Sequence, residues 1–576
     1  MCIRDSIKGE PSTPSDPAQG LVWSAIVAQI DQAGSESAFV SVAEVPRAQL
    51  GKHPWSIGGG GAADLKAELE SDRSVLREFA GEIGIASVNG EDDVFILDCE
   101  AQAGRIGIEH IIGLVTGDVV RDWSAGSQVA VWLYDQDFNL LDLSTLPGTA
   151  AHFWPARSVL SKRKRFGTPM LDKGLTWYEF QELYVSKLRT PLTITFAEVA
   201  THNHFVLDRG GKVFKQSALV LKLSEGQTEN DHLEILGTLN TSVGCFWMKQ
   251  TFHNKGGGGI GGGLATEEWE QFYEFDSTKI RSFPVPEENA LSVARDLDAL
   301  AVELRGCLPS NIAEDRPPTV DVLAASKKQV KGLFECMISM QEELDWRAYQ
   351  LYGLVDEELT MPNGAAPPIR LGERAFEIAM GRKMVTEEID TTWFERHGSV
   401  PITEIPSHWP EQYRKLVDRR ITVIESDRNI GLIEQPEHKR RWNMEPWEEQ
   451  ERRALRTWLL SHMEESRYWP SPEMISCARL ADYLRSDAEF QQVAALYRGR
   501  PDFDWTALVM ELVEAESVPF LAVLRYTDSG VRKRVVWERT WELQRQEDGI
   551  DAEVRADDKI PGPLKAEAAK KRKAVY

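Results

Sequence analysis

The pattern of hydrophobic and polar positions changes near residue 287. Before it, apolar residues form short and partly alternating runs, such as "PLTITFAEV", which are separated by Asn-Gly, Gly-Gly and similar turn signals. Short alternating runs between turns predict β-strands. In "HFVLDRGGKVF" two such runs meet at Arg209-Gly210-Gly211, where glycine tolerates a positive φ, and this pattern predicts a hairpin.

Three helical stretches interrupt these strands. "LVWSAIVAQIDQAG" predicts a helix from residue 21, followed by an extended segment, "SAFVSVAEV". Residues 62–82 carry leucines at helical spacing. "TENDHLEILGTLNTSVGCFWMKQ" begins with Thr228 and Asp231, which are spaced like a helix cap, and predicts a helix with an apolar stripe. The stripe contains Leu233, Leu236, Leu239, Val243 and Phe246.

After residue 287 the pattern is predominantly helical. One long stripe ends at Gly353, a plausible C-terminal cap, and consists of Leu333, Met337, Met340, Leu344, Ala348 and Leu351. We therefore predict an α+β fold, in which a mixed, strand-rich domain precedes a mainly α-helical C-terminal module. The predicted limits are a disordered leader at 1–20, a connector at 21–54, the strand-rich domain at 55–286, the helical module at 287–548 and a flexible basic tail at 549–576.

Composition narrows the cellular setting. No stretch reaches the roughly 18 to 20 apolar residues that span a bilayer, and the N-terminus has no signal-peptide core, which together favour a cytoplasmic protein without a membrane partner. The cysteines are scattered without a C-x-x-C pair, which favours reduced thiols over disulfides or a zinc ribbon, so no metal is expected. They are Cys2, Cys99, Cys245, Cys307, Cys336 and Cys477.

The charge is unevenly distributed. The chain has a formal net charge of -24, yet residues 151–222 contain twelve Lys and Arg against five acidic residues, a local charge of +7. A basic island on an acidic protein is typical of a localised polyanion site, although a solvated face that binds nothing has the same composition.

The string His202-Asn203-His204 shares its letters with a nuclease motif. That motif, however, spreads its residues over a ββα-metal unit, whereas here they are contiguous on a strand-like segment. His202 and His204 could share one face of a strand, but two ligands do not make a metal site without further ligands. A metal-dependent nuclease that uses His202 and His204 is therefore the weaker of two alternative hypotheses, and an interaction scaffold is the other.

Two glycine runs, at 57–64 and 255–264, satisfy loose Gly-x-Gly patterns. A phosphate cradle needs a strand before the glycines and a helix N-terminus after them, and neither run has both. Both runs are expected to be loops. The sequence contains no Gly-x-Ser-x-Gly elbow, no His-Glu-x-x-His and no Walker lysine.

The run "ARSVLSKRKRFG" contains the strongest candidates for phosphate contacts. Five such contacts on duplex DNA would give a log–log salt slope of roughly -4.5. The predicted phosphate-binding residues are Arg157, Lys162, Arg163, Lys164 and Arg165. Closer contacts to DNA are predicted for Arg189, Asn203, His204, Arg209, Lys212 and Lys215, and for Asn240 and Lys249 on the following helix.

Longer segments resemble a known family. "HFWPARSVLSKRKRFG", "RTPLTITFAEVATHNHFVLDRGGKVFKQSA" and "HLEILGTLNTSVGCFWMKQTFHNKG" resemble the target-recognition region of large adenine-specific DNA methyltransferases, in particular the PglX type of type 2 BREX phage-defence systems. The resemblance continues through "MQEELDWRAYQLYGL" and "IGLIEQPEHKRRW" and covers most of residues 21–548. Fused restriction-modification enzymes are also similar to these segments.

That family transfers a methyl group from S-adenosylmethionine to adenine N6 through an Asn/Asp-Pro-Pro-aromatic motif. The motif is absent here, since Pro317-Pro318 and Pro367-Pro368 lie in other contexts. The resemblance thus implies the DNA-binding, target-recognition part of such an enzyme. No catalytic or cofactor-binding residue is expected in this chain, and independent activity is not expected. The implied partners are double-stranded DNA, a missing or separate methyltransferase domain and other phage-defence proteins.

Overall fold

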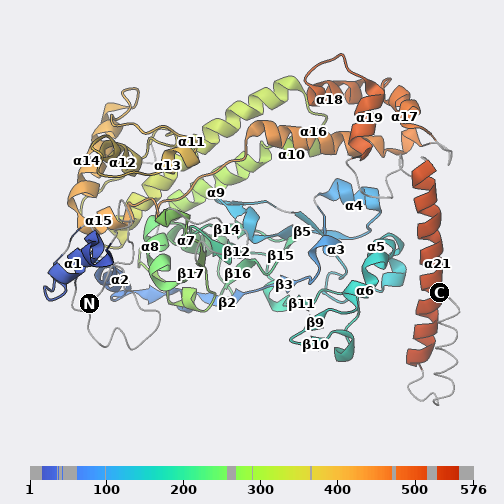
Figure 1. Ribbon diagram of the computed structural model, residues 1–576, viewed down its shortest axis with the longest axis horizontal. Helices are drawn as coiled ribbons and strands as arrows, with labels where there is room; N and C mark the ends of the chain where they lie inside the picture. Colours follow the sequence, from blue (N-terminus) through green and yellow to red (C-terminus); the bar gives the residue numbers. More distant parts are fainter. Residues whose placement is uncertain are drawn as a thin grey trace.

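The computed structural model describes residues 16–35, 37, 40, 42, 61–97, 99–126, 128–255, 267–288, 290–362, 366–469, 475–514 and 528–556. Strands are concentrated in the first half of the chain and helices in the second half (Figure 1). The predicted α+β class is therefore confirmed.

The strands are mostly short. They are β1 (Ser74–Val75), β2 (Ala80–Gly84), β3 (Ser87–Val88), β4 (Ile96–Leu97), β5 (Ile111–Val115), β6 (Val120–Arg121), β7 (Ser124–Ala125), β8 (Gln128–Val131), β9 (Lys164–Arg165), β10 (Thr168–Pro169), β11 (Glu182–Leu183), β12 (Thr193–Ala197), β13 (Val199–Ala200), β14 (Phe205–Asp208), β15 (Lys212–Phe214), β16 (Ala218–Leu223), β17 (His253–Asn254), β18 (Tyr273–Glu274) and β19 (Pro284–Val285).

The helices of the first half are α1 (Leu21–Gln29), α2 (Ala62–Glu70), α3 (Asp92–Phe95), α4 (Glu100–Ile106), α5 (Pro147–Phe153), α6 (Arg157–Leu160), α7 (Glu229–Leu239) and α8 (Ser242–Thr251). Those of the second half are α9 (Leu291–Gly306), α10 (Pro309–Asp315), α11 (Val320–Leu351), α12 (Ala375–Val385), α13 (Trp393–Arg396), α14 (Glu411–Ser426), α15 (Arg428–Ile433), α16 (Trp447–Met463), α17 (Cys477–Leu484), α18 (Ala488–Arg498), α19 (Trp505–Glu514) and α21 (Asp528–Ala556).

Two four-stranded sheets form the centre of the first half. One has the order β14-β12-β16-β2 and is antiparallel throughout. The other has the order β15-β5-β8-β4, in which β15 pairs parallel to β5. Every residue of β12 and β16 is buried, because these strands are covered on both faces. This burial explains why β16 is a nearly continuous apolar run.

The predicted hairpin at Arg209-Gly210-Gly211 is wrong. Both segments are strands, but β14 pairs with β12 and β15 pairs with β5, so the two strands enter different sheets. Gly210 and Gly211 have φ values of 103° and 80°, and this left-handed turn directs the chain from one sheet to the other. A Cβ atom at Gly210 would approach the Pro191 side chain to 3.0 Å.

Two predicted helices are shorter than expected. The helix predicted for 62–82 ends at Glu70, and the chain continues into β1 and β2. The helix predicted after Thr228 has the expected capping box with Asp231, but it divides into α7 and α8, because Thr241 begins a second helix by accepting a hydrogen bond from the Gly244 N–H.

One hydrophobic core crosses from the strand-rich half into the helical half. It contains Leu65 on α2, Leu221 on β16, Leu236 on α7, Leu344 on α11 and Trp442. The predicted stripe on α11 is confirmed, with Met337, Leu344 and Ala348 buried. A second core joins α10, the first part of α11 and α16 to α19. Residue 287 thus marks a change of secondary structure within a continuous core.

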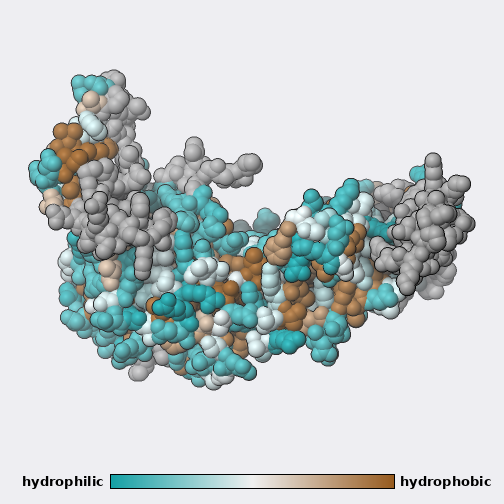
Figure 2. Space-filling view, turned by 90° about the horizontal axis from the view of Figure 1, so that it is seen from below, coloured by the Kyte–Doolittle hydropathy of each residue, from teal (hydrophilic) through white to brown (hydrophobic). Residues whose placement is uncertain are grey.

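The described ends of the chain lie apart. Helix α1 lies at one end of the molecule and α21 at the other (Figure 1). Figure 2 shows apolar residues together at the end where α1 lies, and the exposed apolar residues of this segment are Leu21, Trp23, Val27 and Ile30. The predicted helix at 21 is confirmed. Most of the extended segment after it, most of the leader and tail, half of the glycine run at 57–64 and all but the first residue of the run at 255–264 lie outside the described residues. None of the helices in the described ranges is long and apolar enough to cross a membrane.

Candidate DNA-contacting surface

The run Lys162–Gly167 builds a small β-hairpin. Strands β9 and β10 pair Arg165 with Thr168 and Lys164 with Pro169, so that Phe166 and Gly167 form a two-residue turn. Both turn residues have positive φ, 50° and 79°, as in a type I′ turn. The Met170 N–H donates to the Arg163 carbonyl at 3.0 Å and extends the pairing by one step.

Arg163 holds this hairpin against the body of the protein. Its side chain is buried, and its guanidinium donates to the carbonyl oxygens of Asn89, Trp177, Glu179 and Leu160. Burial lowers its pKa to about 10, which leaves the group cationic at neutral pH. The prediction that Arg163 binds phosphate does not fit this position, because all of these bonds are made inside the protein.

Alternate residues of the run face solvent. Lys162 and Lys164 are exposed, and neither forms a side-chain ion pair with any residue of the described ranges. Arg165 is half-buried, with its guanidinium carbon 5.8 Å from the centroid of the Phe166 ring. Lys173, which the sequence reasoning missed, donates to the Arg165 carbonyl at 2.7 Å and adds a further cation to the hairpin. In the sequence, only its position just beyond the basic run could have indicated this lysine.

Arg157 lies near this hairpin but is held by α21. Its guanidinium is 2.7 Å from the Asp548 carboxylate and 3.7 Å from that of Glu547. It also lies over the rings of Trp154 and Trp177, both at 5.6 Å from the centroid. The C-terminal helix therefore competes with any phosphate for this arginine.

The segment His202-Asn203-His204 is buried beneath residues 436–440. The His204 Nδ1 accepts hydrogen bonds from the Asp122 N–H at 3.2 Å and from the Arg440 guanidinium at 2.8 Å, so this nitrogen carries no proton. The His202 Nε2 lies 3.1 Å from the Pro436 carbonyl and must donate to it. Burial and neighbouring cations lower the pKa of both imidazoles well below their ordinary value. Neutral rings bonded to separate partners do not form a cation site, which argues against the nuclease hypothesis.

The two predicted asparagines join α7 to the sheet. The Asn203 amide donates to the carbonyls of Leu239 and Thr241, at 2.7 and 2.9 Å, and so satisfies the C-terminal end of α7. Asn240 exchanges two hydrogen bonds with the backbone of Phe205, at 3.0 and 2.9 Å. Both residues are buried, and their amides are engaged in holding the fold.

Lys249 is buried on α8 and has no hydrogen-bond partner for its Nζ among the described residues. The ammonium lies 5.1 Å from the centroid of the Tyr273 ring, and burial lowers its pKa. Arg163, Asn203, His204, Asn240 and Lys249, all predicted for DNA contact, thus form no part of an exposed surface in this structure. These polar residues, which the sequence pattern indicated as DNA contacts, are part of the buried core.

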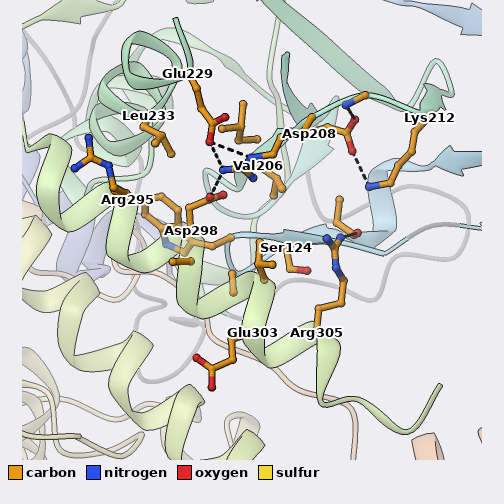
Figure 3. A pocket seen from close by; sticks show the side chains of 18 of the residues that line it. Ser124, Val206, Asp208, Lys212, Glu229, Leu233, Arg295, Asp298, Glu303 and Arg305 are labelled. Atoms are coloured by element: carbon orange, nitrogen blue, oxygen red, sulfur yellow. Dashed lines mark hydrogen bonds and ion pairs between the residues drawn. The ribbon is translucent and has the colours of Figure 1, made fainter. Parts of the chain in front are cut away.

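Two further candidates, Arg209 and Lys212, line a separate cavity. The Arg209 guanidinium lies 2.6 Å from each of two carboxylates, those of Glu229 on α7 and Asp298 on α9. Figure 3 shows these two carboxylates directed toward one another. Lys212 pairs with Asp208 at 2.6 Å in the same cavity, which has a volume of about 710 Å³. Burial raises the pKa of Asp298, although Arg209 opposes the shift. Because the acidic partners neutralise these cations, the cavity does not favour an anion.

Arg189 and Lys215 complete the candidate set. Arg189 is exposed beside a small hollow that Lys187, Lys212 and Lys222 also line. Lys215 forms an ion pair with Asp92. The structure therefore does not bring the thirteen predicted residues together. It leaves Lys162, Lys164 and Arg165 on the β9–β10 hairpin as the cations that face solvent on one element.

One group of side chains in the described ranges has metal-ligand composition, namely His462, Asp487 and Glu489. Arg467 lies 2.7 Å from the Asp487 carboxylate and also contacts the His462 Nε2. The other Asp487 oxygen accepts from the backbone N–H groups of Glu489 and Phe490 and caps α18. A cation already fills this group, so it is a structural cluster.

The described residues do not fit S-adenosylmethionine. A doubly wound, mostly parallel sheet with a glycine-rich strand-to-helix turn is the common nucleotide-type cofactor scaffold. Among the described strand pairs, only β5 and β15 are parallel, and β15 is followed by β16 without an intervening helix. The cofactor that the resemblance implies has no cradle in this part of the chain.

One curated relative matches almost the full length of the chain. The chain is 39% identical, over 98% of its length, to the adenine-specific methyltransferase PglX of Streptomyces coelicolor, of which it covers 48%. The resemblance to PglX-type methyltransferases is thereby confirmed, and the chain spans about half the length of this curated relative. Residues 337–576 match a family described as a domain of unknown function, DUF7008.

Among solved structures, the chain is similar to the type IIL restriction-modification enzyme MmeI, which was solved in complex with DNA. The identity is 13% and the TM-score 0.30, with 48% of this chain and 33% of that chain covered. A similarity this weak carries no conclusion about fold or ligand.

Proposed function

We propose that this chain is the DNA-binding, target-recognition portion of a site-specific adenine-N6 methyltransferase of bacterial phage defence. The β9–β10 hairpin would contact the phosphate backbone of duplex DNA. In this proposal, methyl transfer from S-adenosylmethionine belongs to a methyltransferase domain that the described residues do not form. A relative that matches 98% of the chain is an adenine-specific methyltransferase, which supports this assignment.

The observation that carries the proposal is that Lys162 and Lys164 are exposed and not neutralised by carboxylates of the described residues. Both are exposed and without ion pairs among the described residues, on a protein whose net charge is -24. Three other candidate cations, Arg209, Lys212 and Lys215, instead form ion pairs with carboxylates. Unneutralised cations on a rigid hairpin are suited to polyanion contact, since phosphate neutralisation releases condensed counterions.

The test is duplex-DNA binding as a function of salt. We expect the full chain to bind a mixed-sequence, end-labelled duplex with a salt-dependent affinity, measured by fluorescence anisotropy. The double variant Lys162→Gln/Lys164→Gln should reduce the log–log salt slope by about 1.8, because each phosphate contact contributes roughly 0.9.

The matched control is Lys328→Gln/Lys331→Gln, which removes the same charge from exposed positions on α11. It should leave the slope unchanged. An interaction scaffold without a DNA role predicts no salt-sensitive binding by the wild-type chain and equal behaviour of both double variants, and that result would remove the proposal.

A further inference from the structure

The tip of the β9–β10 hairpin has an unexpected residue. Phe166 is 73% exposed, and its φ of 50° lies in the left-handed region, which a bulky side chain rarely adopts. Two-residue turns with two positive φ values favour Asn-Gly or Asp-Gly. Here Gly167 fills the second position as expected, but phenylalanine occupies the first, where asparagine would relieve both the backbone strain and the exposure of apolar surface. Strain of this kind points to a function for the side chain.

The base of the hairpin is rigid. The buried guanidinium of Arg163 donates to carbonyl oxygens of Asn89, Trp177 and Glu179, and the Gln181 side chain donates to the Lys164 carbonyl at 2.8 Å. The tip is therefore held by the body of the protein. A rigid support lets a small apolar tip enter a narrow space without first being ordered.

The ring is surrounded by cations. The Lys173 ammonium lies 5.3 Å and the Arg165 guanidinium carbon 5.8 Å from its centroid, and Lys164 precedes Arg165 on β9. Lysine is depleted at protein–protein interfaces, so a ring beside Lys173 and close in sequence to Lys164 suits a ligand with negative charge outside and flat apolar surfaces within better than a protein partner. Duplex DNA has this arrangement, with phosphates flanking stacked bases.

We propose that Phe166 is a wedge residue, which inserts between adjacent base pairs of duplex DNA while the flanking cations contact the phosphates. This inference rests on the proposed function and adds to it a specific contact and a deformation of the DNA. Apolar side chains inserted at base steps partially unstack the duplex and kink it. Unstacking costs least where a base pair is already weakened.

The test compares a matched duplex with the same duplex carrying one central mismatch. The wild-type chain should bind the mismatched duplex more tightly, by about fivefold, because the wedge enters a weakened step at lower cost. Phe166→Asn should remove this preference while its melting temperature stays the same or rises, since Asn-Gly suits the turn. Phe166→Trp, which keeps an aromatic ring, should retain the preference.

Val385→Asn is the matched control, because Val385 is also 73% exposed and ends α12 in the helical half. It should behave as the wild type. Salt-dependent binding to both duplexes with equal affinity, or a preference that survives in Phe166→Asn, would overturn the wedge while leaving the proposed function intact. In that case we would infer that the Phe166 ring contacts another protein instead of DNA. Absence of any salt-dependent binding by the wild type would instead overturn the proposed function itself.

Discussion

The guanidinium of Arg440 lies 2.6 Å from the Oδ1 of Asn240, although 200 residues separate them in the sequence. The same guanidinium reaches the Nδ1 of His204 at 2.8 Å and the carbonyl oxygen of Asn203 at 3.2 Å. One arginine of the helical half thus completes the hydrogen bonding of the strand-rich half. Burial lowers its pKa to about 10.

Replacing this arginine should therefore destabilise the whole chain. Arg440→Met leaves the buried carbonyl oxygen of Asn203 without its guanidinium donor and removes one of the two donors to the Asn240 Oδ1, which we expect to cost about 3 to 5 kcal/mol of unfolding free energy. Urea denaturation measures this loss. Arg453→Met is the control, because its pair with Glu445 is exposed and should contribute about 1 kcal/mol or less. Equal losses in both variants would contradict a structural role for Arg440.

Stability should depend on pH through Glu342. One lysine, Lys439, is shared by the buried carboxylates of Glu342, Asp345 and Glu434, at 3.2, 2.8 and 3.0 Å. Burial and the two neighbouring carboxylates raise the pKa of Glu342 to about 7. A raised pKa stabilises the folded state at pH values below the ordinary value of 4.5, and this stabilisation is lost as the pH rises through about 7.

Glu342→Gln removes that loss, because glutamine stays neutral. Its stability relative to the wild type should therefore be greater at about pH 8 than at about pH 5, by roughly 3 kcal/mol. Urea unfolding at both pH values measures the difference. Glu357→Gln, which removes a carboxylate from an exposed pair with Arg419, is the control and should show the same relative stability at both pH values. A pH-independent effect of Glu342→Gln would show that this carboxylate is ionised throughout.

Two buried lysines should respond in opposite ways to the same substitution. Lys249 has no hydrogen-bond partner among the described residues, and burial lowers its pKa, so Lys249→Met should raise the unfolding free energy by about 1 to 3 kcal/mol at neutral pH. The gain should shrink as the pH approaches 10.5, since a lysine with a lowered folded pKa costs least where both states are neutral.

Lys222 provides the contrast, because its ammonium donates to the carbonyls of Thr190 and Leu192 and to the hydroxyl of Thr193. Burial lowers its pKa to about 8, although the nearby carboxylates of Asp208 and Glu82 oppose the shift. Lys222→Met should therefore lower stability by about 2 to 4 kcal/mol. Thermal unfolding of the two methionine variants side by side checks both signs, and a destabilised Lys249→Met would show that its ammonium has a role in the fold.

Neighbouring residues of the basic run should separate into structural and surface roles. Arg163→Met removes the guanidinium that holds the hairpin and should lower stability by about 2 to 4 kcal/mol, because several carbonyls lose their donor. Lys164→Gln changes an exposed side chain and should alter stability by less than about 0.5 kcal/mol. The melting temperatures of the two variants measure whether only the Arg163 substitution destabilises the protein. A similar loss in both would indicate that the run acts as one unit.

The sequence alone determined the α+β class, the change to helices near residue 287, the stripe on α11 and the cap at Thr228, because these features arise from local periodicity and local hydrogen bonding. It also supported the family resemblance. Long-range pairing decided the rest. Periodicity does not say which strand a strand will join, and so the segment 205–214 entered two sheets.

Burial was likewise decided only by the tertiary structure. The four residues Lys162 to Arg165 carry the same charge, but the Arg163 side chain is directed into the protein, where it donates hydrogen bonds to carbonyl oxygens. The histidines of the "HNH" string became neutral core residues because residues 436–440 cover them. Whether a polar group faces solvent depends on what packs over it, and for this chain that partner lies some two hundred residues away.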